Sequence, residues 1–138
     1  MSRMCLWLAI GVAVSGGAVR AAPSVPKGAP RAAAAWLRLV DQGRYGQSWR
    51  IASALFKRAV TQDGWQRAME QIRAPLGPVA RRRPFRTTAT TSLPGVPDGH
   101  YVVLQYRTSF AHKASALETV TCVQEADGAW RVAGYFIR

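Results

Sequence analysis

Residues 100–110 read HYVVLQYRTSF, and this stretch decides the fold class. β-Branched and aromatic residues dominate it, and they favour extended strands. Successive side chains of a strand point to opposite faces. The more apolar face, which we expect to turn toward helices, consists of Val102, Leu104, Tyr106, Thr108 and Phe110. The other face is mixed and carries Tyr101, Val103, Gln105, Arg107 and Ser109.

Three further extended runs surround this strand, at residues 85–93, 117–125 and 130–137. Asp127-Gly128 separates the last two, and this pair accepts the positive φ angles of a type I′ hairpin turn. A longer turn, LPGVPDG at residues 93–99, joins the first two strands. The C-terminal half is therefore predicted to be a four-stranded antiparallel meander.

Upstream of Gly77 the apolar period is helical instead. A first helix is expected from about Pro30 to Gly43, and a second short helix from about Tyr45 through Phe56. Thr61 can cap a third helix, which ends at Pro75 and Gly77. The fold class predicted is α+β, with about three N-terminal helices packed on one face of a curved four-stranded antiparallel sheet.

The first 21 residues have the features of a cleaved secretory signal peptide. Arg3 precedes an apolar stretch at residues 4–14, and Val19-Arg20-Ala21 places short residues where a signal peptidase reads. The alternative is an uncleaved anchor or a short buried helix. We expect residues 22–28 to form a flexible leader and residues 29–138 a single domain of an exported protein, periplasmic or secreted. The mature chain should lack a transmembrane segment.

The mature chain is expected to be strongly basic and to contain a single cysteine. Without Arg3 and Arg20, the 19 basic residues fall to 17 against 7 acidic residues, a formal charge of +10. This field favours anionic partners such as lipid headgroups, lipopolysaccharide, acidic polysaccharide or nucleic acid. The alternative is compositional, because a GC-rich coding sequence also produces many arginines and alanines. Cys5 leaves with the signal peptide, so Cys122 is the single remaining thiol, and no disulfide is expected.

Motifs spread over nearly all of the mature chain resemble one known family. They are Trp36-Leu37, Leu39-Val40-Asp41, Gly43, Tyr45, Ser48-Trp49, Ala52-Ser53, Phe56-Lys57, Trp65, Arg73, Leu76-Gly77, Leu93-Pro94-Gly95, Asp98-Gly99, Tyr101, Thr108, Phe110, Lys113, Glu118-Thr119-Val120, Asp127-Gly128, Trp130-Arg131-Val132 and Gly134-Tyr135. As a set they are similar to the bacterial exported family catalogued as domain of unknown function 4019. The resemblance implies a cone-like fold of the nuclear transport factor 2-like type, which hosts binding modules, dehydratases and isomerases, so the fold does not select a function.

Candidate catalytic residues are few. Glu118 shares a strand face with Val120 and Cys122, so it is either a buried acid or base or one partner of a strand-edge salt bridge. Cys122 has the position of a small buried hydrophobe. His100 and His112 have no second histidine or cysteine at metal-ligand spacing, so no metal site is expected. No nucleophile elbow, phosphate-binding loop or dinucleotide fingerprint is present, and no cofactor is expected.

Two groups of residues are candidates for binding. Candidate lining residues of an apolar pocket are Trp49, Trp65, Tyr106 and Phe110, with core packing as the alternative. Candidate anion-binding residues are Arg81, Arg82, Arg83 and Arg86. Alternation would put Arg82 and Arg86 on one side of the strand, and the alternative role of the charges is protection of a sheet edge. With only Phe85 nearby, nucleic acid is not favoured as the partner.

The sequence favours a noncatalytic module that binds a small apolar ligand or an anionic envelope partner. The alternative is a cone-fold enzyme, a hydrolase, isomerase or dehydratase, that uses Glu118 or a tyrosine inside the pocket. A third hypothesis is a homodimer through the mixed sheet face that bears Tyr101, Val103 and Arg107.

Overall fold

A computed structural model describes residues 24–138 and confirms the α+β class. The elements are α1 (Gly28–Asp41), α2 (Tyr45–Arg50), α3 (Ala54–Ala59), α4 (Gln62–Ile72), the 3₁₀ helix η1 (Ala74–Leu76), β1 (Val79–Thr90), β2 (Tyr101–Phe110), β3 (Lys113–Gln124) and β4 (Trp130–Ile137). The predicted signal peptide at residues 1–21 lies outside the described residues. Part of the predicted leader is described, and Val25 in it packs half-buried against the core.

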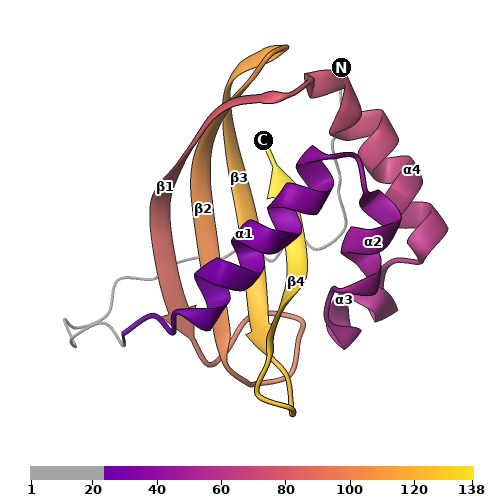
Figure 1. Ribbon diagram of the computed structural model, residues 1–138. Helices are drawn as coiled ribbons and strands as arrows, with labels where there is room; N and C mark the ends of the chain where they lie inside the picture. Colours follow the sequence, from indigo (N-terminus) through magenta and orange to yellow (C-terminus); the bar gives the residue numbers. More distant parts are fainter. Residues whose placement is uncertain (1–23) are drawn as a thin grey trace.

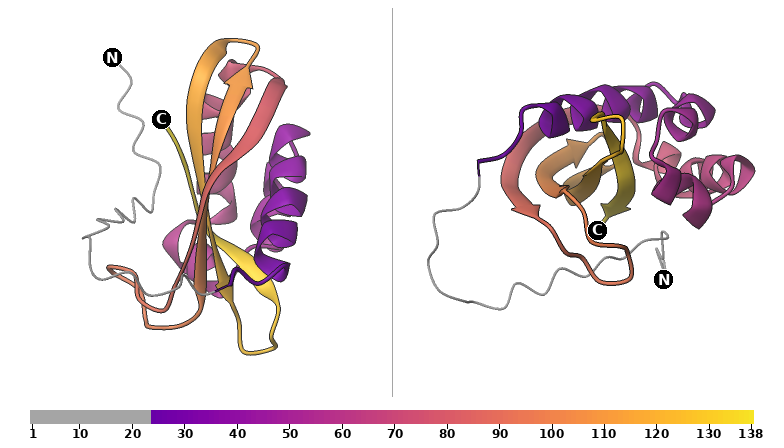
Figure 2. Two further views of the ribbon diagram at one scale, coloured as in Figure 1. Left: turned by 90° about the vertical axis from the view of Figure 1, so that its left-hand side faces the viewer. Right: turned by 90° about the horizontal axis from the view of Figure 1, so that it is seen from below.

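The four strands form one antiparallel sheet in the order β1-β2-β3-β4, so β1 and β4 are its edges. α1 crosses one face of the curved sheet, while α2, α3 and α4 gather beside β4 (Figure 1). Figure 2 includes a view from below, in which α1 covers one face of the sheet and the other helices lie to the side of β4. We call the sheet face toward α1 the inner face and the opposite one the outer face.

The second predicted helix is wrong in its extent, because the stretch from Tyr45 to Phe56 forms two helices, α2 and α3. Ser53 separates them with an extended backbone. Its Oγ accepts a hydrogen bond from the Phe56 N–H (3.2 Å), and its own N–H donates to the Val132 carbonyl of β4 (2.9 Å). A serine in this conformation begins a new helix. The described chain therefore has four α-helices where about three were expected.

The first and third strands are longer than predicted. β1 begins at Val79 rather than Phe85, and β3 begins at Lys113 rather than Leu117. Val79 and Lys113 both pair with Phe110, the last residue of β2. Backbone pairing to this buried central strand therefore extends its neighbours over residues of weak strand propensity.

A register shift in β1 changes which arginines share a face. It falls between Pro84 and Arg86, on an edge strand, where a proline without an N–H and a bulge are both tolerated. Arg82 pairs with Thr108 of the inner face, whereas Arg86 pairs with Gln105 of the outer face. The predicted placement of Arg82 and Arg86 on the same side is thus wrong.

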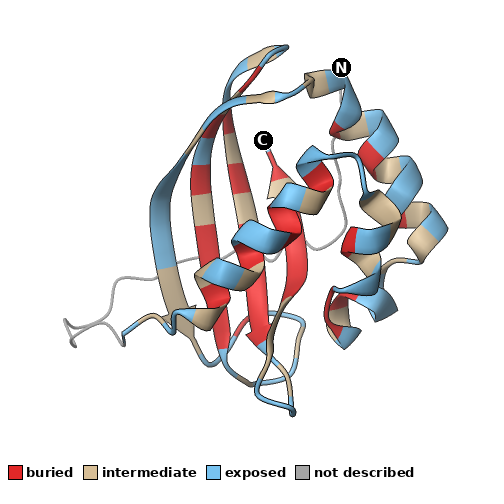
Figure 3. Cartoon of the chain, in the orientation of Figure 1, coloured by how far each residue is buried: buried red, intermediate tan, exposed pale blue. Residues whose placement is uncertain are grey.

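An aromatic cluster fills the space between the helices and the inner face. It consists of Trp36, Phe56, Trp65 and Tyr135, with ring centroids 4.9 to 6.3 Å apart. Both buried indole N–H groups donate to Ser48, from Trp36 to its carbonyl and from Trp65 to its Oγ (2.9 Å each). Figure 3 shows buried residues on α1, on the helices beside β4 and on β2, β3 and β4, whereas β1 is exposed or half-buried.

A smaller apolar cluster covers part of the outer face. It contains Leu93, Tyr101, Val103, Val123 and Ala133. The connection between β1 and β2 supplies Leu93, and its Pro97 carbonyl accepts a hydrogen bond from the Tyr101 hydroxyl (2.5 Å). Tyr101 and Val103, proposed above for a dimer interface, are thus buried within one chain, whereas Arg107 stays exposed.

Candidate functional site

Glu118 of β3 lies on the inner face with no solvent exposure. Its Oε1 accepts hydrogen bonds from Arg82 Nε (2.8 Å) and the Thr108 hydroxyl (2.5 Å). Its Oε2 accepts from Arg82 Nη2 (3.1 Å) and from the Tyr135 hydroxyl. A carboxylate offers about four acceptor positions, so these four donors occupy all of them.

Arg82 connects this buried carboxylate to the helical layer. Its Nη1 and Nη2 donate to the Asp41 carboxylate at the end of α1 (2.7 and 3.0 Å), and Arg73 Nη2 donates to the same group (3.2 Å). Burial alone would lower the pKa of Arg82, but the hydrogen bonds to Asp41 and Glu118 raise it. We call Asp41, Arg73, Arg82 and Glu118 the ion-pair network.

The tyrosine beside Glu118 holds its proton firmly. Burial, followed by the adjacent Glu118 charge, raises the pKa of Tyr135 well above its usual value. Tyr135 therefore donates to the carboxylate and does not exchange its proton with it near neutral pH. The four hydrogen bonds fix the position of the Glu118 carboxylate. They leave Glu118 without a free acceptor position for a substrate proton.

The four pocket candidates all pack against the main core. Trp65, Tyr106 and Phe110 are buried, and burial raises the pKa of Tyr106 to about 12. Trp49 is half-buried and donates its indole N–H to the Val60 carbonyl (2.8 Å). Trp65 lies in the aromatic cluster, and Phe110 lies under the Arg73 guanidinium.

Two surface pockets of the described chain are lined by residues other than the four pocket candidates. One, of about 500 Å³, opens at the start of α4 and is lined by Thr61, Gln62, Asp63, Gly64 and Arg67. The other, of about 360 Å³, lies where β1 ends and β2 begins. It is lined by Ser24, Pro26, Ala89, Thr90, Thr91, His100, Tyr101, Val102, Gln124 and Trp130. Neither includes a residue of the ion-pair network.

Four exposed arginines gather on the outer face of β1 and β2. We call Arg81, Arg83, Arg86 and Arg107 the outer arginine cluster. Within residues 24–138 none of them forms an ion pair. Arg83 and Arg107 pair directly across the strands, and like charges in that position destabilise a sheet.

An exposed aromatic ring lies among these charges. Phe85, at the bulge of β1, is 43% exposed. The Arg107 guanidinium lies 4.1 Å from the centre of its ring, and that of Arg86 5.5 Å. Such contacts orient guanidinium groups while leaving their N–H donors available.

Sequence reasoning identified three members of this cluster and missed the fourth. Arg82 had been grouped with its neighbours, but it points inward to the ion-pair network, with its side chain 16% exposed. Arg107 replaces it on the surface. Alternation had already placed Arg107 on the mixed face, but its position opposite Arg83 follows from strand register, which the sequence does not display.

The cysteine and histidine residues do not extend the site. Burial raises the pKa of Cys122 to about 12, which suits an inert thiol packed against the start of α1. In the described range no three His, Cys, Asp or Glu side chains gather as metal ligands. No helix of residues 24–138 is long and apolar enough to cross a membrane.

A family model matches most of the chain. Residues 32–135 match the model of a family described as protein of unknown function (DUF4019). No curated protein matches the chain. Because the match covers most of the chain and agrees with the motifs quoted above, this protein belongs to the DUF4019 family.

Proposed function

We propose that this protein is an exported, noncatalytic binding module that recognises an anionic envelope partner through the outer arginine cluster. The observation that carries the proposal is the unneutralised pairing of Arg83 with Arg107 on an exposed sheet face. This pairing opposes folding. An anionic ligand would turn the repulsion into attraction.

The distribution of acidic residues supports the proposal. Asp41 and Glu118 are occupied by the ion-pair network, and Glu125 and Asp127 by Arg131. The remaining acidic residues lie on α4 and in the connection from β1 to β2, and none pairs with the cluster in residues 24–138. The charge of the cluster is therefore available to a partner, and it would increase the association rate at low salt.

The two other hypotheses have less support. A small apolar ligand would need a cavity, but aromatic side chains occupy the space between the helices and the sheet. An enzyme would need an available acid or base, but Glu118 has four donors on its carboxylate. We therefore assign the proposed function to the surface.

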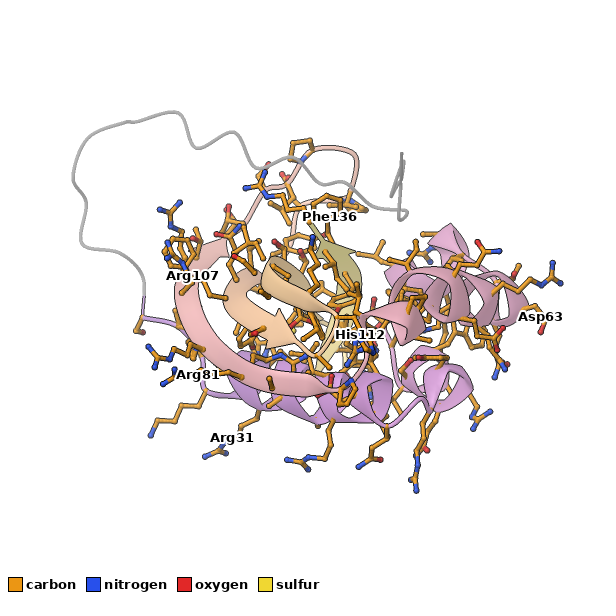
Figure 4. All side chains as sticks on the ribbon, turned by 90° about the horizontal axis from the view of Figure 1, so that it is seen from above. Arg31, Asp63, Arg81, Arg107, His112 and Phe136 are labelled. Atoms are coloured by element: carbon orange, nitrogen blue, oxygen red, sulfur yellow. The ribbon has the colours of Figure 1, made fainter. Side chains whose placement is uncertain are left out.

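Retention on heparin tests the proposal. The Arg83→Ser/Arg107→Ser double variant should elute at clearly lower salt than the wild type. Arg58→Ser/Arg67→Ser is the matched control, because these exposed arginines lie on α3 and α4 and the change in net charge is identical. Figure 4 shows Asp63, one turn before Arg67 on α4, at the opposite end of the molecule from Arg107. Equal elution of the two double variants would mean that retention reports net charge alone and would contradict the proposal.

A further inference from the structure

The outer face combines the arginine cluster with apolar side chains. Phe85 and Ile51 are the large hydrophobic residues with substantial exposure in the described chain, at 43% each, and the Phe85 ring contacts two guanidinium groups, those of Arg86 and Arg107. Half-buried Leu117 pairs with Arg107, and half-buried Phe136 of β4 pairs with Thr119 on the same face. Figure 4 shows Arg107 and Phe136 on the side of the sheet away from α1 and Arg31.

The rows across the strands combine cationic and apolar side chains. One row runs Arg83, Arg107, Leu117 and ends at exposed Arg138, whose backbone pairs with Leu117, and the next runs Arg86, Gln105, Thr119, Phe136. Neither row contains an acidic side chain. A surface with this composition suits a partner that offers negative charge next to an apolar layer.

We infer that the outer face docks on an anionic lipid surface, with Phe85 entering the headgroup layer and the arginine cluster on lipid phosphates; the inference rests on the function proposed above. The guanidinium of Arg107 beside the Phe85 ring places a phosphate-binding group next to the inserting group. A soluble acidic polymer would need the charges but not the exposed ring. Single-stranded nucleic acid would use rings for stacking, but it needs several, and Phe85 is the single strongly exposed aromatic residue of the described chain.

The test compares vesicles with heparin. Binding is measured by cosedimentation with vesicles of mixed phosphatidylglycerol and phosphatidylcholine, and with vesicles of phosphatidylcholine alone. The wild type should bind the mixed vesicles and lose this binding in high salt. Phe85→Ser should weaken binding to the mixed vesicles about fivefold, as expected for withdrawing a partly exposed phenylalanine from an apolar layer. Its heparin elution should remain that of the wild type.

Ile51→Ser is the matched control, because it removes an equally exposed hydrophobe from another part of the surface. It should leave both measurements unchanged. Arg83→Ser/Arg107→Ser should weaken both, by about fivefold for each arginine on vesicles.

The outcomes separate the two proposals. Equal vesicle binding by Phe85→Ser and the wild type, with heparin elution still dependent on Arg83 and Arg107, would overturn the lipid inference and leave the proposed function standing. A loss of heparin or oligonucleotide binding in Phe85→Ser as large as the loss on vesicles would also overturn it, because the ring would then contact a polymer. If the arginine variant and its control elute alike from heparin, the proposed function itself fails.

Discussion

Replacing Arg82 with methionine removes the cation that lies between Asp41 and Glu118 while keeping an apolar stem of similar length. Glu118 has no solvent exposure, and two of its four hydrogen-bond donors belong to Arg82. Removal of one partner from a buried ion pair costs about 3–5 kcal/mol, because the other charge is left uncompensated. We therefore expect the free energy of unfolding to fall by about 4 kcal/mol, which for a chain of this size lowers Tm by roughly 15 °C.

Urea unfolding followed by tryptophan fluorescence measures this loss, since Trp36 and Trp65 lie in the core. Arg81→Met is the matched control: it changes the adjacent residue, which is exposed and points to the outer face, and should alter stability by less than about 0.5 kcal/mol. Glu118→Gln should cost about 1–3 kcal/mol, less than Arg82→Met, because Arg82 then keeps its bonds to Asp41.

The reasoning would be refuted if Arg82→Met and Arg81→Met were equally stable within about 0.5 kcal/mol. That result would mean that the Arg82 contacts contribute no more to the free energy of unfolding than exposed salt bridges do, about 0–1 kcal/mol.

Two further predictions concern the core and a helix start. Burial raises the pKa of Cys122 to about 12 from its ordinary 9.0, so the unfolded chain releases this proton first and the free energy of unfolding falls as pH rises above 9. Between about pH 8 and pH 10 the wild type should lose about 1 kcal/mol more than Cys122→Ala in urea unfolding, and equal losses would contradict the assignment. Ser53→Ala should cost about 1 kcal/mol by thermal unfolding through loss of the α3 cap, and Ser53→Thr should recover part of it; an alanine variant as stable as the wild type would show that the cap contributes nothing.

Apolar spacing and turn residues predicted helices and strands correctly where no contact with a distant part of the chain overrides them. The run at residues 100–110 forms β2 with the expected apolar face inward. A hairpin precedes β4 as predicted, but the type I′ turn on Asp127-Gly128 is wrong. The Gly128 N–H donates to the Glu125 carbonyl (2.9 Å), so Ala126 and Asp127 are the central residues of the turn, and Gly128 follows them with φ of 84°. The break at Ser53 was missed because the apolar spacing continues across it. Its cause is a hydrogen bond from the Ser53 N–H to Val132, a residue distant in sequence.

The candidate site was predicted less well than the fold. The sequence left open whether Glu118 is a buried acid or base or one partner of a strand-edge salt bridge. The choice could not be made from the sequence, because the partners of Glu118 come from β1, β2 and β4. The cationic segment was identified, but the inward direction of Arg82 depends on how β1 pairs with β2.

Sequence alone determined the α+β class, the basic character of the chain and the family resemblance, because periodicity, composition and motifs are local properties. The direction of each arginine was determined by strand register and by the bulge between Pro84 and Arg86, which depend on pairing between residues far apart in the chain. A shift of one residue in a strand moves a side chain to the opposite face. For this reason Arg82 points inward and pairs with buried Glu118, while Arg81, Arg83, Arg86 and Arg107 remain on the surface.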